Sequence, residues 1–381
     1  MRKGNRKLYE QRLIEIVRSR LAARGFFYHV KREQGRFIIE NPAGDTDGRI
    51  ANDLTAVFGI IEVCPCLKLA DRTLPVIFDA ACEIFAKSCQ HKNISSFKIE
   101  TKRGDKNFPI NSQSVSAAVG SHILEKFPFF TVDVKNPAVT VHIEIRNHAY
   151  VYSEGFKGVG GLPYGTSGKG VLLLSGGIDS PVAGFLMARR GLDVVAVHFH
   201  SPPHTSERAK EKTADIARRL AFYTGSVKLY AVRFSDVQLY LYKNVPTDKL
   251  TIHLKRAMLR ISEIIALREH AQCLITGDSV GQVASQTAQG ILESESAAAL
   301  PVLRPLCGMD KQEITNIAKD IGTFPISILP FDDCCTLFVA KNPESRPKAS
   351  VIEAIESRLP ELSDLCENAA DTAEINEYLF P

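Results

Sequence analysis

Hydrophobic periodicity divides the first 72 residues into a small α+β module. Apolar residues recur at helical spacing at Leu13, Ile16, Val17 and Leu21, and Gly25 ends this helix. Alternating residues in 26–31 and 36–40 predict a hairpin. A helix over 48–58 and a strand over 60–69 complete the predicted module.

A second α+β unit is predicted for residues 73–168. An amphipathic helix over 76–89 precedes a strand over 96–103, and Asn111 or Ser112 caps the next helix. Residues 139–145 and 149–152 alternate and predict a hairpin. The stretch 155–170 is a glycine-rich connector, so we expect a domain boundary there.

Strands and helices alternate in residues 169–381, which favours a doubly wound parallel sheet of the α/β class. The predicted strands are 170–174, 194–199, 227–232 and 273–276, and the predicted helices include 207–223, 248–270 and 310–321. Ligands of such sheets bind beyond the carboxyl ends of the strands. Three polar stretches are predicted there: Ser175–Ser180, His198–His200 and Gly277–Gln282.

The first of these stretches has the composition of an anion-binding turn. Its two glycines allow backbone N–H groups to approach a ligand closely, and its two serines add hydroxyl donors. The helix that follows, with Pro181 in its first turn, adds the positive end of its dipole. Asp179 would repel a phosphate unless it holds Mg²⁺. An ordinary strand-to-helix turn is the alternative, and six specified residues in this context favour the anion site.

Composition indicates a globular protein of two or three domains. The 381 residues are 45% hydrophobic and 24% charged. No apolar run reaches the ~18 residues of a membrane helix, and the basic N-terminus lacks the apolar segment of a signal peptide. We therefore expect a cytoplasmic location without membrane contact, in which the nine cysteines are thiols.

Charge is distributed unevenly along the chain. Eleven Lys and Arg residues stand against three Glu residues in 1–36, whereas eight acidic residues stand against Arg358 in 351–381. A basic first module suggests a polyanion such as nucleic acid, and a solvated helix face is an equal alternative. Lys98, Lys102 and Arg103 lie on a predicted strand, for which a solvated strand face is the alternative, and the basic first module favours RNA backbone contact by these residues.

Several other residues are candidates for chemistry at the predicted sheet edge. His198 and Phe199 follow a strand, although as side chains they are better explained as the end of a core strand. Lys255 and Arg256 lie on a helix, and Gln286 lies in a long polar loop typical of functional loops. Asp310 and Glu313 predict a capping box, and Lys311 lies within it, in the first turn of the helix, where a cation opposes the helix dipole. A functional role of Lys311 and an exposed surface lysine are nearly equal alternatives.

Cys334-Cys335 is a vicinal pair that follows two aspartates. One such pair is not a metal site. A thiolate near the anion-binding turn is a candidate sulfur carrier in the form of a persulfide. Because the aspartates raise a thiol pKa, activation of Cys334 requires a cation from elsewhere.

Together these motifs resemble a known family over nearly the whole chain. Ser-Gly-Gly-x-Asp-Ser at 175–180 resembles the PP-loop of ATP pyrophosphatases, and residues 97–103 with 136–145 resemble a THUMP domain of RNA-modifying enzymes. The first module resembles a ferredoxin-like domain. With the segments 160–166, 277–287, 309–311 and 332–335, the chain resembles the tRNA 4-thiouridine synthetases. The expected domains are ferredoxin-like 1–72, THUMP 73–168 and PP-loop 169–381.

The resemblance implies an ATP-dependent thiolation of uridine 8 of tRNA to 4-thiouridine. ATP adenylates O4, and a cysteine persulfide supplies the sulfur. The resemblance implies adenylation roles for Asp179 and Lys311 and a sulfur-carrier role for Cys334. With ATP and Mg²⁺ as cofactors, it implies ATP contacts at Leu173, Leu174, Ser175, Gly176, Gly177, Asp179, Ser180, His198, Phe199, Lys255 (or Arg256), Gly277 and Gln286.

The resemblance also implies partners. The THUMP domain would hold the acceptor end of tRNA, a cysteine desulfurase would supply sulfur, and a homodimer is compatible with it. Longer family members append a rhodanese domain with a second cysteine, and this chain ends at Pro381 without one. The candidates for the resolving thiol are therefore Cys335, Cys307 and Cys273, and sulfur transfer for thiamine thiazole synthesis is the less favoured role.

Two other functions compete with thiolation at O4. The first is another PP-loop chemistry, such as amidation or 2-thiolation, but PP-loop enzymes of those kinds lack an N-terminal THUMP domain. The 2-thiolating enzymes also usually carry Cys-x-x-Cys pairs, which this chain lacks. A non-catalytic RNA-binding protein is disfavoured because Ser175, Asp179, Ser180 and Cys334 are all in place.

Overall fold

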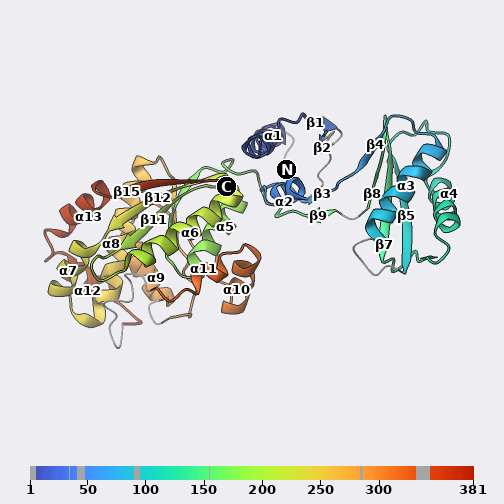
Figure 1. Cartoon of the computed structure of the whole chain (residues 1–381). Coiled ribbons are helices and arrows are strands. Elements are labelled where there is room, and N and C mark those ends of the chain that lie inside the picture. The colour runs from blue at the N-terminus through green and yellow to red at the C-terminus, as the bar shows by residue number, and fades with distance from the viewer. Residues whose placement is uncertain are drawn as a thin grey trace. The chain divides into compact units, whose positions relative to one another are not determined.

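The computed structural model describes residues 6–33, 35–40, 48–89, 95–153, 155–283, 286–331 and 344–381 (Figure 1). Contacts divide the chain into two compact units. The larger unit is formed by residues 1–42, 56–59 and 159–381, and the smaller unit by 43–55 and 60–158. The domain boundaries at 72/73 and 168/169 stay a prediction from the sequence.

A six-stranded sheet lies at the centre of the larger unit, in the order β14-β13-β10-β11-β12-β15. Its strands are β10 (Lys169–Leu173), β11 (Asp193–His200), β12 (Ser226–Arg233), β13 (Cys273–Ile275), β14 (Val302–Leu303) and β15 (Glu374–Leu379). The pairs from β14 to β12 are parallel, which confirms the predicted α/β sheet. β15 adds an antiparallel edge that was not predicted, because its polar, exposed residues carry little hydrophobic pattern.

Helices cover both faces of this sheet. Alternate strand residues point to opposite faces, so Val171 and Leu274 enter one core while Leu172 and Ile275 enter the other. The first core includes residues of α7, α8 and α13, and the second includes residues of α5, α6 and α10. The helices are α5 (Asp179–Arg189), α6 (Glu207–Thr224), α7 (Ser235–Asn244), α8 (Leu250–Arg268), α9 (Ala288–Glu295), α10 (Lys311–Asp320), α11 (Phe324–Ser327), α12 (Ala349–Glu356) and α13 (Leu362–Asp371).

The first helix of the chain, α1 (Arg6–Ala23), is part of the larger unit. Its predicted apolar stripe is buried at Leu13, Val17 and Leu21. Arg20 is also buried and donates to the carbonyls of Phe222 and Tyr223 at the end of α6. The predicted hairpin that follows is confirmed as β1 (Val30–Glu33) and β2 (Arg36–Ile39).

The smaller unit contains a five-stranded sheet in the order β4-β8-β7-β5-β6. Its elements are α2 (Arg49–Thr55), β3 (Glu62–Val63), β4 (Leu67–Leu69), α3 (Leu74–Cys89), β5 (Ser96–Arg103), α4 (Ser112–Lys126), β6 (Thr131–Val132), β7 (Val139–Ile145), β8 (Ala149–Tyr152) and β9 (Phe156–Lys157). Asn111 caps α4, and β7 pairs with β8 as the predicted hairpin. Residues of α3, α4, β5 and β7 form the core of this unit.

Across the described ranges, the structure contains no helix with the length and apolar character needed to cross a bilayer.

Candidate active site

The turn 175–180 connects β10 to α5 and is closed by its two serines. The N–H of Ser175 donates to Oγ of Ser180 at 2.9 Å, and the two hydroxyl oxygens are 3.0 Å apart. The loop after β13 packs directly against this turn, since a Cβ at Gly277 would lie 2.7 Å from the nitrogen of Ser180. Glycine is therefore required at position 277 by close packing.

The N-terminus of α5 lies at this turn. Ile178 is the N-cap residue and makes no side-chain capping bond. A helix N-terminus without a capping side chain leaves backbone N–H groups for an anion, and the helix dipole favours negative charge there. The turn therefore has the geometry of the predicted anion site.

Asp179 and Lys311 are 132 residues apart in sequence and meet beside the turn. Nζ of Lys311 donates to Oδ1 of Asp179 at 2.6 Å, and Nε2 of Gln282 donates to Oδ2 at 3.0 Å. Lys311 is the first residue of α10, and the predicted capping box of Asp310 and Glu313 is confirmed. Gln282 lies in the polar stretch 277–282 that the sequence placed at this edge of the sheet, but its contact with Asp179 was not predicted.

A second carboxylate, Asp278, organises the loop that follows β13. Its Oδ1 accepts from Nζ of Lys255 at 3.2 Å and from Nε2 of Gln286 at 3.1 Å. Its Oδ2 accepts from Thr276 at 2.9 Å, and Nε of Arg304 lies 3.7 Å away. Burial by itself raises the pKa of Asp278, but Lys255, Thr276 and Arg304 outweigh burial, so the pKa is lowered. Sequence reasoning missed Asp278 as the residue that brings Lys255 and Gln286 together.

The structure distinguishes the two neighbouring cations of α8. Lys255 faces the loop after β13 through Asp278, as described above. Arg256 is buried and binds Glu356 of α12 and the carbonyl of Glu293. Of the two, Lys255 is therefore the cation that faces the loop after β13, whereas Arg256 stabilises the contact between α8, α9 and α12.

His198 and Phe199 end β11 as core side chains. His198 is buried, and its Nδ1 donates to the carbonyl of Leu174 at 3.2 Å. Burial lowers the pKa of His198 to about 4, so the ring is neutral at physiological pH. Phe199 packs edge-on against Phe234 with a centroid distance of 5.2 Å. Because the side chains of His198, Phe199 and Leu174 are buried, only their backbone groups are available for contact with a ligand.

The predicted sulfur carrier Cys334, with Asp332, Asp333 and Cys335, lies outside the described residues. The segment that leads to it is fixed against the site. Ser327 Oγ donates to the carbonyl of Gly177 at 3.1 Å. The buried Lys212 of α6 donates to the carbonyls of Leu329 and Phe331 at 2.8 and 3.3 Å. Lys212 is thus a cation at the start of the cysteine segment.

The two described candidates for the resolving thiol lie at opposite edges of the sheet. Cys307 is beside the loop after β13, with its Sγ 3.9 Å from the carbonyl oxygen of Asp278. Cys273 begins β13 at the amino edge, where it pairs with Gly170. Burial raises the pKa of both thiols. Position therefore favours Cys307 over Cys273.

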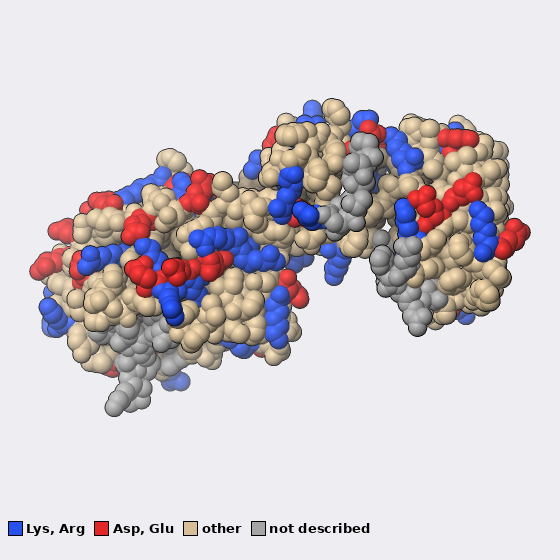
Figure 2. All heavy atoms as spheres, in the orientation of Figure 1, with Lys and Arg blue, Asp and Glu red and all other residues tan. Residues whose placement is uncertain are grey.

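The basic residues expected to contact RNA are partly occupied by the protein itself. Arg103 donates to the carbonyls of Phe108 and Ile110, and Lys102 lies 3.4 Å from Glu100. Lys98 lies on the same strand as a half-buried residue. Over the visible surface, Lys and Arg side chains are interspersed with Asp and Glu (Figure 2). A role of these three residues in RNA binding stays a prediction.

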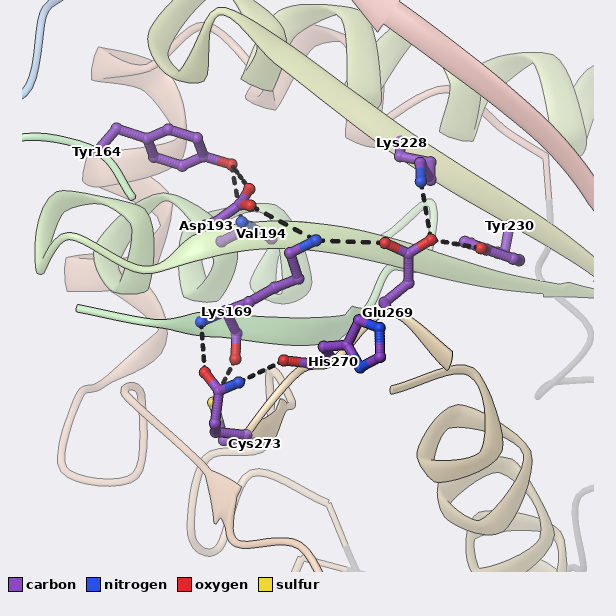
Figure 3. Close-up of polar contacts among 10 residues, drawn as sticks. Tyr164, Lys169, Asp193, Val194, Lys228, Tyr230, Glu269, His270 and Cys273 are labelled. Atoms are coloured by element: carbon purple, nitrogen blue, oxygen red, sulfur yellow. Dashed lines mark hydrogen bonds and ion pairs between the residues drawn. The ribbon is translucent and has the colours of Figure 1, made fainter. Parts of the chain in front are cut away.

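A different polar network lies at the amino edge of the same sheet (Figure 3). Glu269 accepts from Tyr230 at 2.6 Å, Lys228 at 2.8 Å and Lys169 at 3.3 Å. In the connector, Tyr164 donates to Asp193 at 2.9 Å and accepts from the N–H of Val194 at 2.7 Å. This network connects the starts of the parallel strands and the connector, and it lies away from the turn.

Comparison with known proteins agrees with this architecture. Residues 165–360 match the family model described as thiamine biosynthesis protein (ThiI), residues 71–154 match the THUMP domain, and residues 1–64 match the ThiI ferredoxin-like domain. The first of these models covers the turn and both carboxylates.

Full-length relatives extend the likeness to the whole chain. A probable tRNA sulfurtransferase of Lachnoclostridium phytofermentans is 46% identical over 373 residues, covering 97% of this chain and 95% of that protein. One from Acetivibrio thermocellus is 43% identical, covering 97% and 94%. The crystal structure of a 4-thiouridine synthetase–RNA complex with bound ATP has a TM-score of 0.92 at 35% identity, covering 99% and 96%. The chain belongs to the tRNA sulfurtransferase family.

Proposed function

We propose that this protein uses ATP to convert uridine 8 of tRNA to 4-thiouridine. The observation that carries this proposal is the pairing of Asp179 with Lys311 beside a serine-closed turn at the uncapped N-terminus of α5. The related 4-thiouridine synthetase was crystallised with RNA and ATP, and its fold matches over nearly the whole chain. Family, fold and site geometry therefore support the same chemistry.

In the first step, O4 of the uridine attacks the α-phosphorus of ATP and pyrophosphate leaves. The turn 175–180 and the N-terminus of α5 hold the phosphates, and Lys311 offsets charge that develops on them. Lys255 and Gln286 contact the nucleotide from the loop side. Mg²⁺ would accompany the triphosphate and offset its charge, and the carboxylate of Asp179 and the turn hydroxyls are suitable oxygen ligands for it.

In the second step, the terminal sulfur of a persulfide on Cys334 attacks C4, and AMP leaves with the O4 oxygen. A second thiol then attacks Sγ of Cys334, which breaks the sulfur–sulfur bond and leaves the thiolated base with a protein disulfide. An external thiol reduces this disulfide. Lys212 is a cation at the start of this segment. Of Cys273 and Cys307, Cys307 is better placed to resolve the intermediate.

The proposal includes the partners of the reaction. A cysteine desulfurase transfers sulfane sulfur from free cysteine to Cys334. The smaller unit binds the acceptor end of tRNA, with Lys98, Lys102 and Arg103 as phosphate contacts.

The test is a thiolation assay with the full-length protein, unmodified tRNA, MgATP, a desulfurase and cysteine. We expect 4-thiouridine in the digested tRNA by mass spectrometry. A matched tRNA with cytidine at position 8 should yield none. Unchanged uridine in the presence of an active desulfurase would refute the function.

Two variants separate the steps. Cys334→Ala should release pyrophosphate but form no thiouridine, whereas Asp179→Ala should lose pyrophosphate release and keep tRNA affinity. Persistent thiolation by Cys334→Ala would place the sulfur carrier elsewhere. Loss of tRNA binding in Asp179→Ala would contradict the separation of the two roles.

A further inference from the structure

The carboxylate of Asp278 fixes which end of the Gln286 amide faces it. A carboxylate can only accept hydrogen bonds, and the lowered pKa of Asp278 keeps it ionised at neutral pH. The amide of Gln286 must therefore turn its NH₂ group toward Asp278, where the distance is 3.1 Å. The carbonyl oxygen Oε1 is consequently directed away from the carboxylate.

The remaining groups around Asp278 hold it in this position. Lys255, Thr276 and Arg304 all present donors or positive charge to its two oxygens. Arg304 is itself largely buried and donates to Glu295 at 2.6 Å and to the carbonyl of Val302. Rotation of Asp278 would break several of these contacts, so its orientation is determined by the surrounding fold.

Oε1 of Gln286 is shielded from solvent and accepts no hydrogen bond from any described residue. A buried acceptor without a donor is unfavourable, and such groups are uncommon in folded proteins. A hydrogen-bond donor supplied by a ligand would satisfy it. Phosphate oxygens cannot do so, because they only accept.

We propose that Asp278 is a positioning residue that presents Gln286 to the nucleotide as a hydrogen-bond acceptor, so that the site selects nucleotides carrying a donor at the matching position. This inference rests on the proposed function, which places Gln286 among the ATP contacts. ATP offers three such donors, the 6-amino group of adenine and the 2′- and 3′-hydroxyls of the ribose. Inosine triphosphate replaces the amino group with a carbonyl oxygen, which would face Oε1 acceptor to acceptor.

A purely structural role of Asp278 predicts a different result. Loss of the ion pair between Asp278 and Lys255 would change the affinity for every nucleotide with the same triphosphate by the same factor. That factor cancels when the affinity for one nucleotide is divided by the affinity for another. A change in this affinity ratio therefore reports the orientation of Gln286 and not the charge of Lys255.

The experiment measures dissociation constants of the full-length protein for ATP, inosine triphosphate, 2′-deoxy-ATP and 3′-deoxy-ATP in the presence of Mg²⁺. The wild type should disfavour at least one of the three analogues about 5- to 100-fold, and the disfavoured analogue identifies the donor. In Asp278→Asn, the new amide can donate to Oε1 of Gln286, so the Gln286 amide can turn over. The ratio of the dissociation constant for the disfavoured analogue to that for ATP should then fall to about 2 to 3. Gln286→Met should lower it equally, and the double variant should lower it no further.

Glu295→Gln is the matched control, because it neutralises a carboxylate that contacts Arg304 without touching Gln286. Glu295→Gln should keep the wild-type ratio of dissociation constants between the disfavoured analogue and ATP. Equal affinity of the wild type for all four nucleotides would overturn the inference, and so would an unchanged ratio in Asp278→Asn. Absence of any nucleotide binding would instead refute the proposed function on which the inference rests.

Discussion

Both edges of the central sheet carry a carboxylate paired with lysine, but the two pairs differ in exposure and in the number of hydrogen-bond donors. At the carboxyl edge, the carboxylate of Asp179 meets Lys311 and Gln282 in a pair whose lysine is 48% exposed. At the amino edge, Glu269 is 10% exposed and receives three donors (Figure 3). The first arrangement leaves its charges accessible to a ligand, whereas the second has satisfied its charges internally.

We therefore expect ligand binding to depend on the carboxyl edge of this sheet and stability to depend more on the amino edge. An exposed ion pair contributes little to folding, because solvent screens it. A largely buried carboxylate with several donors contributes more, because removal of one partner leaves charge without compensation. Substitutions at the two edges should therefore affect different measurements.

The largest effect is expected for Lys311→Met at the carboxyl edge. Removal of the cation beside the turn should lower the rate of pyrophosphate release about 10²- to 10³-fold, since it withdraws charge stabilisation from the transition state. Its free energy of unfolding should stay within about 0.5 kcal/mol of the wild type. Full activity, or a large loss of stability, would show that the pair is structural.

His198 is a buried group at the carboxyl edge that should act on stability alone. Its pKa in the folded protein is about 4, below the usual 6.5, so protonation favours the unfolded chain. Stability contributed by the neutral ring is present above pH 6.5 and is lost as the pH falls toward 4, by up to about 3 kcal/mol. Denaturant titrations across this range should show the loss in the wild type and a flatter profile in His198→Asn, in which an amide replaces the donor to Leu174.

Glu269→Gln should destabilise the protein by about 2 kcal/mol at neutral pH, because Lys169 and Lys228 lose their shared carboxylate. Activity per folded molecule should be unchanged. Burial alone raises the pKa of Glu269, but its donors outweigh burial and the pKa is lowered. The stabilisation is therefore lost as the pH falls below about 4.5, and the two proteins should converge in acid. A parallel pH dependence of the two would contradict this assignment.

Tyr164→Phe tests the attachment of the connector and should have the smallest effect. It removes the hydroxyl that donates to Asp193 and leaves the N–H of Val194 without its acceptor. A loss of about 1 kcal/mol is expected in chemical unfolding. A lower rate of pyrophosphate release at full folding would instead connect this edge to catalysis.

Sequence patterns were sufficient for features that depend on local chemistry. The turn 175–180, the hairpins, the cap at Asn111 and the capping box of Asp310 and Glu313 follow from residue types at short spacing. The antiparallel strand β15 was missed, because an exposed edge strand lacks a hydrophobic pattern. The role of Asp278 was missed for a different reason. Its partners Lys255, Gln286 and Arg304 come from separate elements, and sequence spacing does not encode such proximity.

The sequence by itself determined the strand–turn–helix at 175–180 and the parallel sheet, since these depend on local residue types and periodicity. It also carried the motifs on which the resemblance to a thiolating family rests. Tertiary structure alone decided that Lys311 reaches Asp179, that Lys255 rather than Arg256 faces the loop, and that α1 packs with the larger unit through Arg20. Each of these contacts joins residues that are distant along the chain. Their proximity depends on how helices pack on the sheet, which is a property of the whole fold.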